Sequence, residues 1–217
     1  MHINPDNSFF RVMNAVFDVA AAYVLYILCC LPVVTIGAAT TALHATLLAV
    51  ADDSSSGVLR KFFGSFKEDF RISSTLWLLF AVAGAVVAAD VMICFGFEME
   101  QENSMLYIMR GITLFCVALY ILVFHYTFAG VAKFWVTWKQ ALRNALVCIT
   151  KYPAGAAGVL LLSAATVVCW YLGLIWALPA VMLLVYLREL VLRNVFHKVL
   201  GIKQEKPAHR EKSQYYE

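Results

Sequence analysis

The sequence predicts an all-α membrane protein, a bundle of six transmembrane helices with two amphipathic helices on its cytoplasmic side. Two observations carry this prediction. Of the 217 residues, 62% are hydrophobic and only 14% are charged, and the mean hydropathy is +0.76, above the range of soluble globular proteins. The apolar residues also form long runs separated by short charged segments, which is typical of a polytopic membrane protein.

Six apolar runs are the candidate spans. All but the second reach the roughly 20 residues that a helix needs to cross about 30 Å of hydrocarbon. No cleavable signal is expected, because Asp6 and Arg11 lead directly into the first run and no small-residue cleavage site precedes its bend at Pro32. The runs are residues 12–31, 36–51, 72–95, 105–130, 152–172 and 177–197.

The run at 36–51 is the weakest of these spans. As a helix it covers only about 24 Å, which suits a thin span, a re-entrant half-helix or a continuation of the first helix after a kink. Pro32 and Gly37 allow a tight turn before it. Six spans are therefore the prediction, and five spans with a re-entrant half-helix are the alternative.

The distribution of Lys and Arg sets the expected orientation. With six spans and both termini in the cytoplasm, 16 of the 17 Lys and Arg residues lie inside and only Arg110 lies outside. If 36–51 does not cross, only Arg11 changes sides. The C-terminus is therefore cytoplasmic in both topologies, whereas the N-terminus is cytoplasmic only if 36–51 crosses the membrane. Residues 201–217 are charged and lack an apolar stripe, which predicts a mobile cytoplasmic tail.

A short aromatic and basic phrase occurs twice. The first phrase, "KFFGSFKEDFR", covers residues 61–71, and the second phrase, "KFWVTWKQALR", covers residues 133–143; four of the eleven positions are identical. On helices over about 58–71 and 132–144, each copy gives an apolar stripe and a pair of cations. The stripes are Phe62, Phe66 and Phe70, then Phe134, Trp138 and Leu142, and the pairs are Lys67 with Arg71, then Lys139 with Arg143.

This pattern is typical of helices that lie in the inner membrane interface, with rings toward the acyl chains and cations toward anionic headgroups. Two such helices could have reached similar sequences independently, because both face the same interface. They could instead belong to two hairpins, 36–95 and 105–172, related by a pseudo-twofold axis along the membrane normal. Both interpretations make the phrases cytoplasmic interface elements, and docking of a partner protein through them is a further hypothesis.

Polar residues at membrane depth are few, and each is costly enough to raise a functional question. His44, Asp90 and His125 form the candidate intramembrane polar site. A buried histidine satisfied by a backbone or threonine oxygen is the simpler interpretation. No spacing such as His-x-x-x-His supports a metal, and the six Cys lie inside apolar runs as packing residues. We therefore expect no catalytic residue, no cofactor, no metal and no nucleic-acid partner.

The segments "CCLPVVTIGAATTAL" (29–43), "FFGSFKEDF" (62–70) and "LWLLF" (76–80) resemble the YesL-type bacterial membrane proteins, whose biochemical function is unknown. The resemblance is specific in the first half of the chain and covers the rest by layout. It implies a small multi-pass protein of the bacterial plasma membrane, often encoded beside carbohydrate ABC transporters, glycoside hydrolases and two-component sugar sensors. It supplies no catalytic residues.

Two functions of different classes follow. The first is a non-enzymatic accessory or regulatory protein of a carbohydrate uptake or sugar-sensing system, which docks an ABC permease or a sensor histidine kinase through the two phrases. The second is a small solute transporter or channel with a polar site between pseudo-symmetric halves. Membrane lipids are expected contacts in both. A homodimer through the small-residue face of Ala81, Ala85 and Ala89 is a further candidate assembly.

Overall fold

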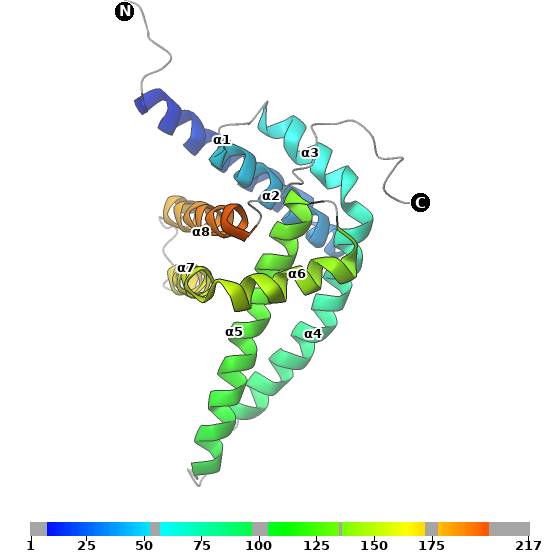
Figure 1. Cartoon of the computed structure of the whole chain (residues 1–217), viewed down its shortest axis with the longest axis vertical. Coiled ribbons are helices and arrows are strands. Elements are labelled where there is room, and N and C mark those ends of the chain that lie inside the picture. The colour runs from blue at the N-terminus through cyan, green and yellow to red at the C-terminus, as the bar shows by residue number, and fades with distance from the viewer. Residues whose placement is uncertain (1–7, 53–56, 97–103, 135, 172–177, 200–217) are drawn as a thin grey trace, which may run out of the picture.

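The computed structural model describes residues 8–52, 57–96, 104–134, 136–171 and 178–199, and every regular element in these ranges is helical. The predicted all-α fold class is therefore confirmed. The predicted tail at 201–217 lies outside the described residues. In chain order the elements are α1 (Ser8–Cys29), the 3₁₀ helix η1 (Val33–Thr35), α2 (Ile36–Ala51), α3 (Val58–Glu68), α4 (Phe70–Gly96), α5 (Ser104–Lys133), α6 (Trp138–Lys151), α7 (Pro153–Tyr171) and α8 (Leu178–Val199) (Figure 1).

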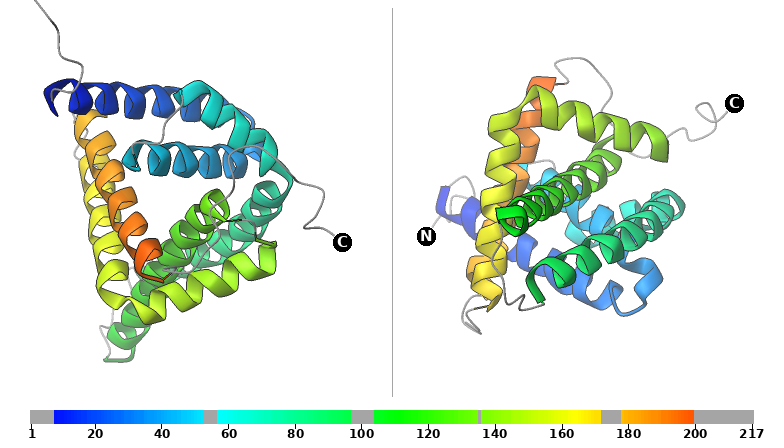
Figure 2. Two further views of the ribbon diagram at one scale, coloured as in Figure 1. Left: turned by 45° about the horizontal axis from the view of Figure 1, so that its top comes forward. Right: turned by 90° about the horizontal axis from the view of Figure 1, so that it is seen from below.

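Helix α2 forms the centre of the bundle. Every residue from Gly37 to Val50 is buried, and the helix contacts α1, α3, α4, α5 and α8. Figure 2 shows α2 enclosed by a frame of the other helices. Its sequence, IGAATTALHATLLAVA, is rich in small residues, which let neighbouring helices approach closely. The run that is weakest as a predicted span is thus the most enclosed helix.

The threonines of α2 satisfy their hydroxyl groups without water. The Oγ1 atoms of Thr40 and Thr46 donate to carbonyl oxygens one turn earlier, at 2.8 and 2.7 Å. The hydroxyl groups of Thr41 and Ser73 of α4 share a hydrogen bond of 2.7 Å. Buried hydroxyls that bond in this way carry little desolvation cost, so α2 can lie in a dry interior.

Helices α4 and α5 form a long antiparallel hairpin that extends away from the rest of the bundle (Figure 1). Most of its surface is apolar and exposed, as at Leu78, Val86, Ile112 and Phe115. At the far end, Arg110 Nε donates to the carbonyl oxygen of Cys94 at 3.2 Å, where a cation complements the C-terminal dipole of α4. A surface this apolar and this long fits a hydrocarbon environment.

Fewer helices qualify as spans than the six that the sequence predicts. Among the described residues, three segments are long and apolar enough to cross a membrane: Val33–Ala51, Phe70–Gly96 and Met105–Lys133. A fourth is counted if Trp138–Lys151 and Pro153–Cys169 act as one span, although this pair bends by 103°. Figure 1 views α7 and α8 almost along their axes while α4 and α5 run across the view. One membrane normal therefore does not align with both hairpins.

Two glycines mark the closest helix contacts. A Cβ atom added at Gly37 would overlap the carbonyl oxygen of Ser73 and the Cβ of Trp77, which belong to α4. A Cβ atom at Gly155 of α7 would overlap the side chain of Val195 in α8. The α2–α4 contact is backbone against backbone, so it has less freedom to adjust than the contact at Gly155.

We expect Gly37→Ala to lower the free energy of unfolding by about 1–3 kcal/mol, because the added methyl group overpacks a site with no flexible neighbour. The matched control is Gly111→Ala in α5, where an added Cβ would have no described atom within 4 Å; it should leave stability unchanged or slightly raised. The measurement is the temperature at which the monodisperse fraction is lost in detergent. Equal stability of the two variants would contradict the close α2–α4 contact.

Candidate functional site

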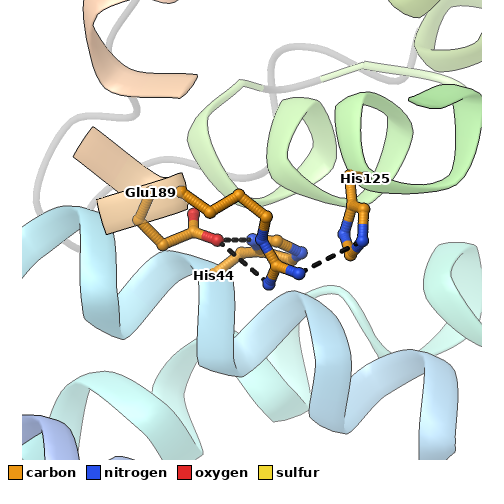
Figure 3. A network of polar contacts seen from close by, with 4 residues as sticks. His44, His125 and Glu189 are labelled. Atoms are coloured by element: carbon orange, nitrogen blue, oxygen red, sulfur yellow. Dashed lines mark hydrogen bonds and ion pairs between the residues drawn. The ribbon is translucent and has the colours of Figure 1, made fainter. Parts of the chain in front are cut away.

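A carboxylate and an imidazole meet in the interior of the bundle. Nδ1 of His44, from α2, lies 2.8 Å from Oε1 of Glu189, from α8. Glu189 is 0% exposed and His44 is 1% exposed. The approach is close, but it is not aligned as a hydrogen bond. Figure 3 shows the two side chains facing each other between the helices. A carboxylate this deeply buried requires compensation of its charge.

Arg188 supplies that compensation and joins a second imidazole to the group. Its NH2 atom lies 3.5 Å from Oε1 of Glu189, and its NH1 atom lies 3.1 Å from Nε2 of His125 in α5. The His44 and His125 rings meet edge-on with centroids 6.1 Å apart. We call His44, His125, Arg188 and Glu189 the buried layer; it joins α2, α5 and α8 (Figure 3).

The contact with Arg188 fixes the tautomer of His125. A guanidinium is always protonated and has no acceptor. Nε2 of His125 must therefore present its lone pair to Arg188, and Nδ1 must carry the ring proton. With both imidazoles neutral, the positive charge of Arg188 balances the negative charge of Glu189, so the buried layer as a whole is neutral.

Several polar atoms of the buried layer remain without a hydrogen-bond partner in the described part of the chain. Oε2 of Glu189, Nε of Arg188 and Nδ1 of His125 have none, and Nδ1 of His44 and Oε1 of Glu189 have only their ionic contacts. A buried polar group left unpaired costs about 1–3 kcal/mol. Such a cost is unusual for a purely structural contact and is common where a site binds water, protons or a ligand.

A second charged group lies where α2 ends. Asp52 is 3.6 Å from Nζ of Lys133 in α5 and 3.6 Å from NH1 of Arg193 in α8. Arg193 also donates to the carbonyl oxygen of Ala51, and cations at this position complement the C-terminal dipole of α2. Asp52 and Arg193 are each 28% exposed. We call Asp52, Lys133 and Arg193 the end layer.

The two layers use the same three helices in the same order. From the buried layer to the end layer the chain advances by eight residues on α2 and on α5, or about 12 Å of helix. On α8 it advances from Glu189 to Arg193. The C-terminal parts of α2, α5 and α8 therefore converge on the end layer. Their C-terminal ends lie together, at the end where α3 follows α2 and α6 follows α5.

The structure brings together two of the three residues of the predicted polar site. His44 and His125 lie in the buried layer, whereas Asp90 lies in the outer part of α4, with its Oδ1 3.9 Å from Sγ of Cys94. Asp90 therefore belongs to the far end of the α4–α5 hairpin.

Sequence reasoning left Arg188 and Glu189 out of the site. Their adjacency places them on different faces of α8, which argued for separate partners. In the structure both side chains reach the same layer, because Arg188 is long enough to bend back toward Glu189. The signal that could have found them is the position of two opposite charges deep inside the apolar run 177–197.

The first phrase forms its aromatic stripe, but the stripe packs largely on the protein. The rings of Phe62 and Phe66 stack at 6.4 Å, and those of Phe66 and Phe70 lie 5.7 Å apart. Phe62 is fully buried in a core cluster with residues of α1, α2 and α8. Lys67 and Arg71 are exposed. The inner part of the stripe therefore attaches α3 to the bundle instead of facing acyl chains.

Neither phrase is one continuous helix. In the first, α3 ends at Glu68 and α4 begins at Phe70, so the predicted helix over 58–71 is interrupted; in the second, the predicted helix over 132–144 is wrong. Helix α5 ends at Lys133 and α6 begins at Trp138. The backbone N–H of Thr137 donates to Oε1 of Gln140 at 3.0 Å, which is one half of a capping box. The Thr-x-x-Gln signature thus starts a new helix inside the phrase.

This break separates the predicted stripe of the second phrase. Phe134 precedes α6 and packs edge-on against Phe196 of α8, with centroids 5.6 Å apart. Trp138 is 44% exposed, with Nζ of Lys139 5.2 Å from its ring centroid. Leu142 packs with the cluster of α4, α5 and α6. Of the three side chains in this stripe, only Trp138 is exposed, whereas both cations of the pair, Lys139 and Arg143, are exposed as predicted.

No group of three or more His, Cys, Asp or Glu side chains suited to a metal ion occurs in the ranges that the structure describes. The chemistry that the buried layer offers is that of charges and exchangeable protons.

Residues 17–91 match the domain family described as "Protein of unknown function, DUF624", to which the YesL-type proteins belong. The match runs from α1 to most of α4 and includes His44 and Asp52, but not α5 or α8. No curated protein and no solved structure matches the chain.

We expect Glu189→Leu to destabilise the protein by about 3–5 kcal/mol, because it leaves the charge of Arg188 buried without its partner. The double variant Arg188→Met with Glu189→Leu should recover much of this loss, since it removes both charges at similar volume. Thermal loss of the monodisperse peak in detergent measures both. A double variant as unstable as the single one would show that unbalanced charge is not the cause.

Proposed function

We propose that the protein is a non-enzymatic integral membrane accessory or regulatory protein of a carbohydrate uptake or sugar-sensing system. It docks an ABC permease or a sensor histidine kinase through α3 and α6. The supporting observation is that both helices adjoin the same end of the α4–α5 hairpin and carry exposed cations. The carbohydrate link rests on the resemblance to YesL-type proteins.

Only some residues of the two phrases are exposed and so available for docking. Phe62 is buried and Phe66 and Phe134 are partly buried, so they serve the bundle. What α3, α6 and the start of α4 expose is mainly basic, with apolar side chains between the charges. We call it the basic surface: Lys61, Phe63, Lys67, Arg71, Trp138, Lys139 and Arg143.

A basic surface with a few exposed rings fits an acidic partner surface by charge complementarity. Trp and Arg are also the side chains that most often dominate binding energy at interfaces. Anionic lipid headgroups carry the same negative charge as an acidic partner surface. An experiment must therefore distinguish lipid binding from docking.

The second candidate function is a small transporter or channel for a solute or for protons. The observation that favours it is the buried layer, because charged groups at membrane depth often mark transport paths. We rank it second because the charged groups of the layer contact one another, which leaves few of them for binding a sugar.

We also propose the six-span arrangement with both termini in the cytoplasm, in which α2 crosses outside to inside. It is supported by the excess of Lys and Arg on the proposed cytoplasmic side, and it requires the α7–α8 pair to cross at a different tilt from the α4–α5 hairpin (Figure 1). In a variant without native cysteines, Val33→Cys should react with an impermeant maleimide in intact cells. Lys61→Cys should react only after permeabilisation.

Both of these positions are exposed in the structure, so the comparison tests membrane side rather than burial. Labelling of Lys61→Cys but not Val33→Cys in intact cells would reverse the proposed orientation. Labelling of neither in intact cells would favour the re-entrant alternative for 36–51.

Docking is tested by affinity purification of the tagged protein from its native host in mild detergent, followed by mass spectrometry. We expect stoichiometric recovery of a permease or sensor kinase. The variant Trp138→Ala with Lys139→Glu and Arg143→Glu should reduce that recovery at least about tenfold, since it removes an anchor and reverses two charges.

The matched control is Phe115→Ala, which removes an exposed ring from the apolar hairpin surface and should leave recovery unchanged. Recovery of the protein alone, as monomer or homodimer, would reject docking. If the triple variant keeps the partner but loses binding to vesicles of anionic lipid, the basic surface is a lipid contact.

A further inference from the structure

We propose that the buried layer is a proton-binding site, in which the His44–Glu189 contact takes up one proton and changes the layer from neutral to singly positive. The proposal does not depend on docking. It rests on the distances and the burial of four side chains.

The close His44–Glu189 contact requires one proton. Two lone pairs 2.8 Å apart would repel each other, so Nδ1 of His44 or Oε1 of Glu189 must carry a hydrogen, although the pair is not aligned as a hydrogen bond. In the neutral layer this hydrogen is the ring proton of His44. The next proton from water would then bind the other ring nitrogen of His44 or the free Oε2 of Glu189.

His125 is excluded as the acceptor. Its Nε2 faces NH1 of Arg188 at 3.1 Å, so a proton there would place two cations in contact and break the hydrogen bond. Its Nδ1 already carries the ring proton. His44 differs because the group nearest to it is the carboxylate of Glu189, which favours a positive charge on the imidazole.

The surrounding helices add few competing charges. On α1, Tyr23 interacts electrostatically with Arg188 and Glu189, and Tyr26 interacts with Arg188. Helix α7, which packs on α8, carries no charged residue, and the two charged residues of α4, Arg71 and Asp90, lie near its ends.

The charged residues of α3 project mainly to the surface. The same three helices also carry the charged end layer of Asp52, Lys133 and Arg193, described above. The four side chains of the buried layer contact one another, and we therefore base the proton balance of this layer on them.

Protonation would matter for the fold because the buried layer fastens α8 to α2 and α5. In the neutral state one anion holds His44 and Arg188 together. With an added proton, the single carboxylate faces two cations if His44 is charged. If Glu189 is neutralised instead, the charge of Arg188 is left without an anion. Either way the forces between the three helices change with pH.

The test is ¹⁵N NMR of histidine-labelled protein in nanodiscs. The chain has five His, and replacing His2, His197 and His209 by Gln leaves only the two imidazoles of the buried layer. The variants His44→Gln and His125→Gln in that background assign the two signals. Spectra are recorded between about pH 8 and pH 5, the range in which imidazoles usually change charge.

We expect the His44 signal to change with pH, while His125 stays neutral with its proton on Nδ1. Adding Glu189→Gln should move the His44 midpoint to lower pH by about one unit or more, because the carboxylate that favours the imidazolium is gone. If instead the added proton binds Glu189, a pH-dependent infrared band of a protonated carboxyl group appears, and Glu189→Gln abolishes it.

Three results would overturn the proposal: both signals constant together with no carboxyl band, His125 charging before His44, or His125 protonated on Nε2. The first would make the layer a fixed ion pair. If Glu189→Gln does not fold, these outcomes are still decided by the spectra of the protein that keeps Glu189.

Discussion

The bundle depends on the balance of two charges that apolar surroundings would otherwise exclude. Glu189 and Arg188 lie next to each other on α8 and share one layer with an imidazole from α2 and another from α5. A lone carboxylate in such a place costs several kcal/mol, so each of the three helices requires the others. The charged contacts of α8 act together with its apolar ones, such as Val195 against Gly155 of α7, to fix its position in the bundle.

The helices themselves could be predicted well from the sequence. Each apolar run became a helix within a few residues of its predicted bounds, because helices in hydrocarbon must satisfy every backbone group internally. The number of spans was less predictable. Length and apolarity identify three or four segments. The direction of a helix depends on contacts that hydropathy does not encode, such as the 103° bend between α6 and α7.

The candidate site could be predicted only in part, for two physical reasons. His44 and His125 were recognisable because a histidine in an apolar run is rare, but the contacts that join them to α8 connect residues far apart in the chain, and no local pattern records them. The repeated phrase led to the opposite kind of error, because it predicted a feature that the structure does not have. Similar spelling suggested two similar continuous helices, yet each copy contains a helix break. The break lies between α3 and α4 in the first copy, and between α5 and α6 in the second, where Thr137 and Gln140 form a capping group.

The complete enclosure of α2 has a consequence for biosynthesis. The ribosome delivers α2 well before α5 and α8, so His44 enters the membrane without the residues that later surround it. Until synthesis nears its end, this short helix can be covered only by α1, α3 and α4, by lipid or by the insertion machinery. The family match at 17–91 ends before the later helices, so the matched segment lacks the partners of His44 on α5 and α8.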